Sequence, residues 1–243
     1  MSQLSNSGLQ DAYDDRMATA PETDGRRTAA AARRRTREKQ ILDATRALFD
    51  ERGVAEARID HIADAVGINR AIVYRHFTGK EEMFALTLVG YLDELTEALT
   101  AASANGKPRD RLAALTGAFV DYGVRYPAFV DCAQALMRRS GPELFEEISE
   151  SAIYRLGRAI SSCLAVLSAS LEAGVESGDF TVEDPELLAN ALYASGLGAL
   201  QLARVGILVK EAAPGVPKVA KVSPDQVKDY LVSSALALAI GPR

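Results

Sequence analysis

Residues 58–80 read RIDHIADAVGINRAIVYRHFTGK, and this stretch decides how the rest of the chain is interpreted. Apolar residues recur at helical spacing over residues 59–66, and Gly67 follows where a left-handed residue commonly ends a helix. Asn69 can then cap a second helix over residues 70–76. Two short helices joined by a glycine-containing turn are typical of a helix-turn-helix, and an ordinary helical hairpin is the alternative.

The second helix of this motif has a basic and aromatic outer face. Val73 and Phe77 lie four residues apart and point inward, which leaves Arg70, Tyr74 and Arg75 on the outside. Such side chains suit phosphates and base edges, and the second helix of a helix-turn-helix enters the major groove of DNA. The motif therefore predicts a DNA interface.

The same stretch resembles a known family over a long pattern. From Ile62 the order Ile-Ala, two residues, Gly-Ile-Asn, four residues, Tyr-Arg-His-Phe and then Lys80-Glu81 is similar to that of the TetR family of bacterial transcriptional regulators. The resemblance covers about residues 37–84, and beyond it the chain is similar to the family only in length and helical layout. It implies base-reading positions at Arg70, Ala71 and Arg75, and phosphate-contacting positions at Tyr74, His76 and Lys80. Arg58, Asn69 and Ile72 complete the DNA-binding residues predicted on this basis.

Two positions depart from the family pattern. Ala57 and Arg58 stand where a threonine or serine is usual, which puts the hydroxyl cap and phosphate contact of the first motif helix in doubt. Ile72 stands where a threonine is frequent, and this favours contact with a thymine methyl group, or simple packing, over a hydrogen bond.

The charge of the chain is distributed as DNA binding requires. The whole sequence carries a formal net charge of -5, but residues 25–80 hold thirteen basic and seven acidic residues, a net charge of +6. Positive charge thus gathers in the segment that contains the motif, where it can neutralise phosphates. A solvated charged face is the alternative for any single arginine.

The N-terminus divides into a tail and an arm. Residues 1–25 are acidic and lack apolar periodicity, so we expect them to be disordered. Residues 26–36 form a basic arm, whose alanine run allows it to continue as helix into the motif. This arm either reaches the DNA backbone or minor groove, or is a solvated lead-in.

The remaining pattern predicts an all-α protein in two parts. A helix-turn-helix DNA-binding domain spans residues 37–82, and a larger helical effector-binding and dimerisation domain spans residues 83–243. No strand pattern of period two is evident, and residues 210–222, with two prolines and a glycine, are predicted to form a loop. Thr78 is expected to cap the helix after the motif, with Glu81 completing a capping box.

An aromatic stripe in the second domain predicts a ligand pocket. Apolar walls with a few hydroxyl groups suit a small molecule, and the region shows no charge cluster, so we expect a largely apolar effector. The predicted lining residues are Tyr91, Phe119, Tyr122, Tyr126, Phe129, Met137 and Tyr154. Plain core packing is the alternative for each of them, and the resemblance implies an effector site in the same region.

The two C-terminal helices, expected over residues 185–209 and 223–240, predict a dimer. The first is apolar nearly all round, and a helix of this kind must be covered on every side. One of its faces carries small residues, including Ala194 and Gly198, that allow another helix to come close. We expect these two helices to form a four-helix bundle with a second copy, and an ordinary core helix is the alternative.

The composition indicates what the chain lacks. Cys132 and Cys163 are the only cysteines, which favours buried thiols over disulfides or a metal site. His61 and His76 are the only histidines, so no catalytic residues, metal or cofactor are predicted. No signal peptide is recognised, and the apolar stretch over residues 187–209 is interpreted as a buried helix rather than a membrane span. A cytoplasmic protein is expected.

Two functions from different classes follow from these patterns. The first is a homodimeric transcriptional regulator, a repressor released from a palindromic operator in double-stranded DNA by its effector. The second is an all-helical enzyme or small-molecule carrier in which the helix-turn-helix serves only as a scaffold. Binding of DNA from upstream of the gene for this protein would separate them.

Overall fold

The computed structural model describes residues 20–241, and the side chains from residue 27 onward. This part of the chain consists of ten helices and one two-stranded antiparallel hairpin, so the predicted all-α class is confirmed with one small addition. The elements are α2 (Ala20–Arg52), α3 (Ile59–Val66), α4 (Arg70–His76), α5 (Lys80–Ala102), α6 (Pro108–Arg125), α7 (Pro127–Met137), α8 (Gly141–Glu147), α9 (Glu150–Glu176), α10 (Pro185–Val205), β1 (Ile207–Ala213), β2 (Val216–Lys221) and α11 (Pro224–Ile240).

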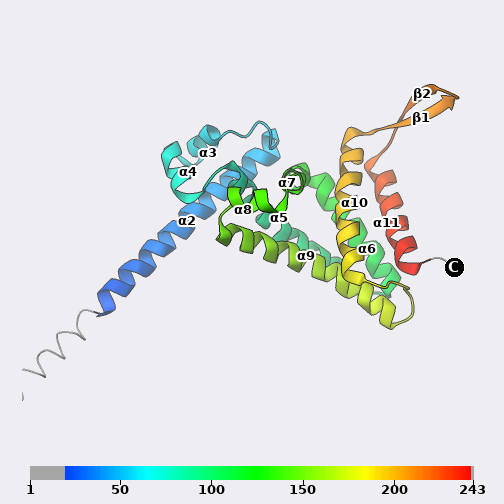
Figure 1. The fold of residues 1–243 in the computed structure, drawn as a ribbon, viewed down its shortest axis with the longest axis horizontal. Coiled ribbons are helices and arrows are strands. Elements are labelled where there is room, and N and C mark those ends of the chain that lie inside the picture. Colours follow the sequence, from blue (N-terminus) through cyan, green and yellow to red (C-terminus); the bar gives the residue numbers. More distant parts are fainter. Residues whose placement is uncertain (1–19, 242–243) are drawn as a thin grey trace, which may run out of the picture.

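The first helix is longer than the sequence indicated. It begins at Ala20, so residues 20–25 are helical rather than part of a disordered tail, while residues 1–19 lie outside the described part. The basic arm continues directly into the motif as one helix, which extends away from the rest of the molecule (Figure 1). The alanine run supports this continuity because alanine has the highest helix propensity.

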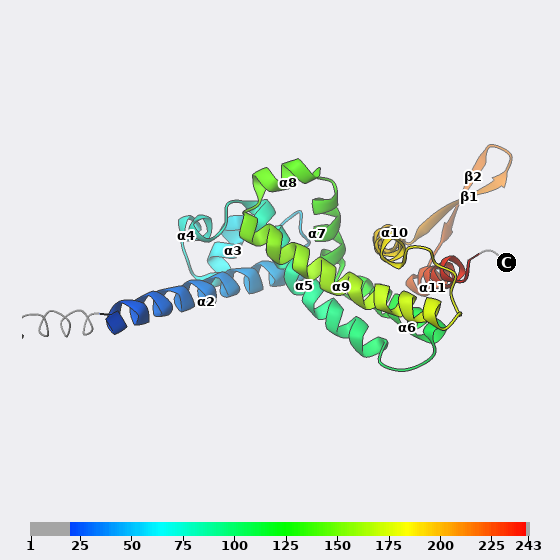
Figure 2. The same ribbon diagram turned by 60° about the horizontal axis from the view of Figure 1, so that its bottom comes forward.

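The larger domain is built around two long helices, α5 and α9. They pack against each other, and α6, α7 and α10 pack on one or both of them. The last helix, α11, lies on α6 and α10 at the end of the molecule far from α3 and α4 (Figures 1 and 2). By length and composition α9 could cross a membrane, but it packs against α5, α6 and α10 as a central helix of the bundle.

One hydrophobic core runs through both domains without a break. Phe49 and Val73 of the motif belong to the same buried cluster as Tyr91 of α5 and Phe129 of α7. A smaller cluster joins the far ends of α6, α9, α10 and α11 around Leu171. Since α5 contributes to both sides of the predicted boundary near residue 82, a displacement of this helix is felt by the motif and by the larger domain alike.

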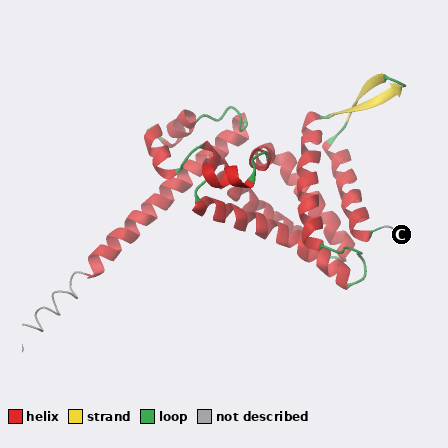
Figure 3. Ribbon diagram, viewed as in Figure 1, coloured by secondary structure: helices red, strands yellow, loops and turns green. Residues whose placement is uncertain are grey.

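The hairpin is the one element that the sequence did not reveal. Residues 210–222 were expected to be a loop, but strands β1 and β2 occupy most of this segment, and α10 ends at Val205 rather than Val209 (Figure 3). The strands escaped notice because both of their faces are exposed, so the sequence shows no alternation of apolar and polar residues.

Candidate DNA interface and effector cavity

The turn between α3 and α4 forms as the sequence predicted. Gly67 ends α3 with a φ of 69°, a left-handed conformation that residues with a side chain rarely adopt. The side chain of Asn69 caps α4 by accepting the backbone N–H of Ala71 at 2.8 Å. Val73 is fully buried and Phe77 nearly so, and together they fix which face of α4 turns outward.

The outward face of α4 carries the predicted contact residues. Arg70, Ala71, Tyr74 and Arg75 are exposed, whereas Ile72 and His76 are half-buried. A short helix with this surface, held at both ends by the core, can lie in the DNA major groove with its side chains directed at base edges.

One carboxylate organises the arginines of the motif. Nη1 of Arg70 lies 3.3 Å from Asp60 on α3, and Nη2 donates to the hydroxyl of Tyr74 at 3.1 Å. Arg58 lies 4.0 Å from the other oxygen of Asp60 and stands at the N-cap of α3 without a side-chain cap. Helix α3 therefore lacks the hydroxyl cap that Ala57 and Arg58 placed in doubt. Asp60 orients two exposed arginines, Arg58 and Arg70, which can turn toward DNA.

The predicted capping box of Thr78 and Glu81 does not form at the start of α5. The Thr78 hydroxyl donates to the backbone carbonyl of Glu147 at 3.2 Å, and no side chain caps α5. The buried carboxylate of Glu82 instead accepts the Thr78 backbone N–H at 2.5 Å and the hydroxyl of Ser149, the N-cap of α9. Because Glu147 and Ser149 are distant in sequence from Thr78 and Glu82, a local capping rule could not find their contacts.

Lys80 lies exposed in the first turn of α5. Its Nζ is 4.9 Å from the ring centroid of Phe84, which holds the lysine stem against the helix. The first turn of a helix has free backbone N–H groups and the positive end of the dipole. The position therefore suits a phosphate, as the sequence predicted.

The basic arm and α4 line one open groove of about 700 Å³. The arm contributes arginines from the outer part of α2, and α4 contributes the residues of its last turn. The lining residues are Ala32, Arg33, Arg34, Thr36, Arg37, Gln40, Ile72, Arg75 and His76. The fold thus brings together the arm and the recognition helix, which the sequence could only place in the same half of the chain.

His76 lies at the wall of this groove, and its ring is neutral, which is unusual for a residue that contacts phosphate. Burial lowers the pKa of His76, and the nearby charge of Arg34 lowers it further, so the ring is neutral near pH 7. Among the described residues its Nδ1 is buried without a hydrogen-bond partner.

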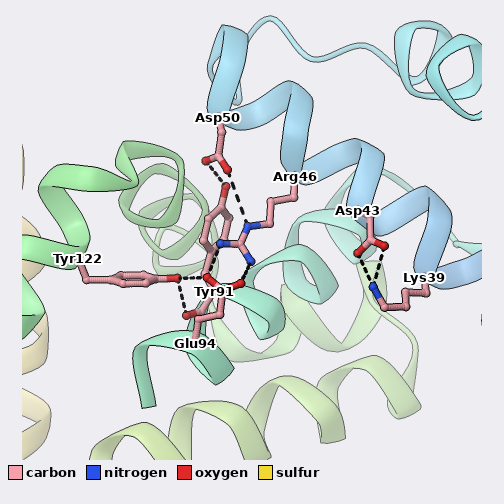
Figure 4. A network of polar contacts seen from close by, with 7 residues as sticks. All are labelled: Lys39, Asp43, Arg46, Asp50, Tyr91, Glu94 and Tyr122. Carbon is pink, nitrogen blue, oxygen red and sulfur yellow. Dashed lines mark hydrogen bonds and ion pairs between the residues drawn. The ribbon is translucent and has the colours of Figure 1, made fainter. Parts of the chain in front are cut away.

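A polar network connects α2 to α5 and α6 (Figure 4). Arg46 of α2 donates two hydrogen bonds to Glu94 of α5, at 2.5 and 2.6 Å, and its guanidinium lies 4.3 Å from the ring centroid of Tyr91. The Tyr91 hydroxyl donates to Asp50 at 2.6 Å. The Tyr122 hydroxyl on α6 donates to the backbone carbonyl of Tyr91 at 2.9 Å. Helix α2, which precedes the helix-turn-helix, is thus tied to α5 and α6 of the larger domain.

A small apolar cavity of about 50 Å³ lies in the larger domain. It is surrounded by α5, α6, α9, α10 and α11, and nearly all of its wall is hydrocarbon. The lining residues are Leu99, Leu115, Thr116, Phe119, Cys163, Leu164, Leu167, Leu192, Tyr193, Gly196 and Leu231. Burial raises the pKa of the Cys163 thiol to about 11 and also raises that of the Tyr193 hydroxyl, so both groups are neutral.

Comparison with known proteins agrees with this geometry. Residues 41–86 match the family model described as bacterial regulatory proteins, tetR family. The transcriptional activator FasR of Mycolicibacterium smegmatis is 32% identical over 117 residues, which are 44% of this chain and 52% of FasR. The transcriptional repressor KstR2 of Rhodococcus jostii is 41% identical over 68 residues, 28% of this chain and 32% of KstR2. The N-terminal part of the chain, residues 41–86, belongs to the TetR family.

Solved structures share the fold of the chain over most of its length. A tetR-family regulatory protein from Rhodococcus RHA1 superposes with a TM-score of 0.60 at 20% identity, covering 85% of this chain and 98% of the other. RolR, solved in complex with resorcinol, gives 0.61 at 18% identity, covering 86% and 90%. FadR of Bacillus subtilis, solved with stearoyl-CoA, gives 0.59 at 14% identity, covering 82% and 98%. The matched parts of FasR and KstR2 are about half and a third of those proteins.

Only one of the predicted effector residues lines the cavity of the larger domain. Phe119 forms part of its wall, whereas Tyr91, Tyr122, Tyr126 and Phe129 stack on one another as an aromatic cluster beside the Arg46 network. The two remaining predictions are wrong. Met137 is 57% exposed and Tyr154 is 66% exposed, because they lie on outer faces of α7 and α9.

Sequence reasoning missed Tyr193 and most of the aliphatic lining. Tyr193 lies on α10, and its ring packs edge-on to that of Phe119 with a centroid distance of 5.9 Å. The helical spacing of Ala189, Tyr193, Gly196 and Leu200 marks an inward face that could have been recognised. The segment was instead interpreted as a dimer interface, and none of its residues was assigned to the pocket.

The opposite face of α10 is uncovered in the single chain. Exposed residues recur every three or four positions along it, as the predicted dimer face requires. They are Leu187, Ala191, Ala194, Ser195, Gly198, Leu202 and Val205. On the neighbouring helix α11, Tyr230 and Leu238 are 72% and 58% exposed. Both helices therefore present large apolar side chains that the single chain leaves exposed.

Proposed function

We propose that this chain is a sequence-specific transcriptional regulator that binds a palindromic operator as a homodimer in the bacterial cytoplasm. It represses transcription and is released from the operator when a small, largely apolar effector binds. The observation that carries this proposal is the surface formed by α4 and the basic arm. It combines an exposed recognition helix with a groove lined by arginines.

The contacts of this surface divide into two kinds. Arg70 and Arg75 face outward from α4, and arginine pairs with guanine O6 and N7 in the major groove. Tyr74, His76 and Lys80 surround them and hold phosphates, which position the protein without reading sequence. The arm arginines add further phosphate contacts along the same groove.

A dimer is needed because one such surface reads only half of an operator. Two recognition helices must lie about 34 Å apart to enter successive major grooves. The exposed faces of α10 and α11 are at the end of the molecule away from α4, so pairing through them leaves both DNA surfaces free (Figure 1).

The effector is assigned to the cavity between α5, α6, α9 and α10. Hydrocarbon walls with the hydroxyls of Thr116 and Tyr193 suit an apolar molecule with one neutral polar group. Two structural neighbours of the same fold are described in complex with stearoyl-CoA and with resorcinol, which supports the proposal of a small-molecule effector.

The small size of the cavity supplies the basis of the switch. A volume of about 50 Å³ is well below the roughly 300 Å³ at the lower end of ligand pockets, so an effector must separate the surrounding helices. α5 is one of them and carries Lys80 at its other end. To reduce operator binding tenfold, the effector must favour the opened state by about 1.4 kcal/mol.

The DNA-binding part of the proposal is tested with an operator selected from random DNA. Lys80→Ala should weaken binding to all sequences alike and reduce the slope of log affinity against log salt by about one unit. Lys107→Ala is the matched control, because Lys107 is an exposed lysine at the N-cap of α6, and it should change neither quantity. Absence of any selected sequence would favour the alternative function, an all-helical enzyme or small-molecule carrier.

The effector part is tested by screening acyl and polycyclic compounds for thermal stabilisation and then for release of operator DNA. Phe119→Ala should change the affinity of each hit by tenfold or more, because its ring forms a wall of the cavity. Met137→Ala, on the exposed face of α7, should have no effect. Unchanged affinity in the Phe119 variant would move the site elsewhere.

A second candidate is an activator, which the match to FasR favours. In vitro transcription from a promoter containing the selected operator separates the two. Repression requires that added protein lowers transcript yield, whereas activation requires that it raises the yield.

A further inference from the structure

The hairpin β1–β2 is inserted between α10 and α11 through a closed base. Gly206 ends α10 in a left-handed conformation with a φ of 70°, and its carbonyl accepts the backbone N–H of Val222 at 3.0 Å. The chain therefore leaves and re-enters the helical body at the same place. The hairpin can be treated as an appendage whose removal need not disturb either helix.

This appendage stands clear of the rest of the protein. Figures 1 and 2 show it extending beyond the ends of α10 and α11, on the side of the molecule away from α3 and α4. Within its strands only Leu208 and Ala220 are even partly buried. An isolated two-stranded hairpin is marginally stable in water, so contacts from outside this chain are expected to hold it in place.

The middle of the hairpin differs in chemistry between its two faces, although Lys221 lies beside Ile207 on the face of the valines and Leu208 lies on the face of Lys210. Val209 pairs with Val219 across the strands, and both are exposed, at 75% and 62%. Ile207, 44% exposed, lies on the same face as these valines. On the other face Lys210 pairs with Lys218, which places like charges opposite each other. The valine face is suited to packing and the lysine face to water.

The hairpin follows directly after the exposed face of α10. That face ends with Leu202 and Val205, and the exposed Ile207 begins β1 two residues later. A strand of seven residues spans roughly 23 Å, whereas packed helices lie about 8–10 Å apart. The hairpin is therefore long enough to cross any helix that packs on α10.

We propose that the hairpin is a dimerisation arm whose valine face packs on the body of a second copy of this chain. This inference rests on the proposed homodimer. A second copy seated on α10 and α11 is the body that lies within reach of the arm, and it buries the valine face while the lysines stay in solvent. DNA is a poor occupant because the arm and the recognition helix lie at opposite ends of the molecule (Figure 1).

Sedimentation velocity of the full chain over a range of concentrations tests this arm. Val209→Thr with Val219→Thr keeps β-branched side chains in the strands but removes their apolar surface. The dimer dissociation constant should rise about tenfold, which corresponds to about 1.4 kcal/mol. Lys210→Thr with Lys218→Thr introduces the same residues on the opposite face and should leave the constant within twofold of the original value.

Excision of residues 207–221, with Asn-Gly joining Gly206 to Val222, is the second variant. It should weaken the dimer at least as much as the valine substitutions while keeping the helical circular dichroism spectrum. Wild-type dimer affinity in both hairpin variants would overturn the arm and leave the proposed dimer intact. A monomeric wild-type protein, even with operator DNA present, would overturn the arm and the proposed homodimer together.

Discussion

Asn69 and Thr78 show how far single residues can be understood from the sequence. Asn69 caps α4 as predicted because its partner, the N–H of Ala71, is two residues away. The Thr78 cap was wrong because Glu82 is held by Ser149, sixty-seven residues further along the chain. The prediction succeeded where both partners lie in one stretch of sequence and failed where the fold brings a distant partner in.

Arg70→Ala should relax the sequence preference of the protein at one base pair in each half-site. Loss of a bidentate pair with guanine weakens specific binding on the order of tenfold to a hundredfold. Binding selections on random DNA would measure the preference. Arg70→Lys is the control for charge, because lysine retains the positive charge but lacks the planar fork. If the alanine variant selects the same operator as the wild type, Arg70 does not read a base.

Operator affinity should rise as the pH falls below about 6.5, through His76. Burial and nearby arginines lower the pKa of His76 in the free protein, whereas a phosphate in the groove would favour the charged ring. DNA binding then takes up a proton, so acid strengthens it. Fluorescence anisotropy between about pH 7.5 and 5.5 should show this slope in the wild type and a flatter one in His76→Gln. Parallel curves would contradict the assignment.

The helices and strands that bury one face in the core were the easiest to predict from the sequence. Helices α3 and α4 have the predicted bounds because their apolar residues face one core, which imposes a helical period. The strands β1 and β2 pack on nothing in their own chain, so no period marks them. The ligand cavity was predicted in the wrong place for a related reason. The aromatic residues of α6 and α7 that suggested a pocket pack against one another instead.

Glu94→Gln should lower the free energy of unfolding at neutral pH and reduce its dependence on acid. The hydrogen bonds from Arg46 hold the pKa of Glu94 below its usual value, so this carboxylate stabilises the fold above the pKa of about 4.3 that it has when unfolded. The contribution is lost as the pH falls through the lower, folded pKa. Urea unfolding at a series of pH values should show the two proteins converging in acid. A constant difference would mean that the effect of the substitution is not electrostatic.

At the scale of the whole molecule, the sequence indicated two domains and the structure joins them. The core is continuous from α2 to α10, and both the Arg46 network and Glu82 connect the motif to the larger domain. Continuity of this kind depends on pairs of residues that are distant in sequence, such as Arg46 and Glu94, and no local pattern reveals them. The exposed faces of α10 and α11, in contrast, could be predicted from the sequence, because these segments contain more apolar residues than one chain can cover.

Gly198→Leu should abolish the dimer without unfolding the chain. A Cβ at Gly198 meets no atom within 4 Å in the single chain, so any obstruction comes from a second copy. Gly157 on α9 is equally open and exposed, and Gly157→Leu is therefore the matched control. Light scattering should show monomer for the first variant and dimer for the second, with operator binding lost only in the first. A dimeric Gly198 variant with normal DNA affinity would place the interface elsewhere.

The unbroken α2 also acts mechanically as a lever. Its anchor at Arg46 and its outer arginine Arg27 are separated by about nineteen residues, or roughly 28 Å along the helix axis. A tilt of about 10° at the anchor would carry Arg27 sideways by roughly 5 Å, more than the roughly 3.4 Å rise per nucleotide along one DNA strand. A small adjustment at the anchor is thus amplified into a larger displacement of the arginines at the tip of the arm.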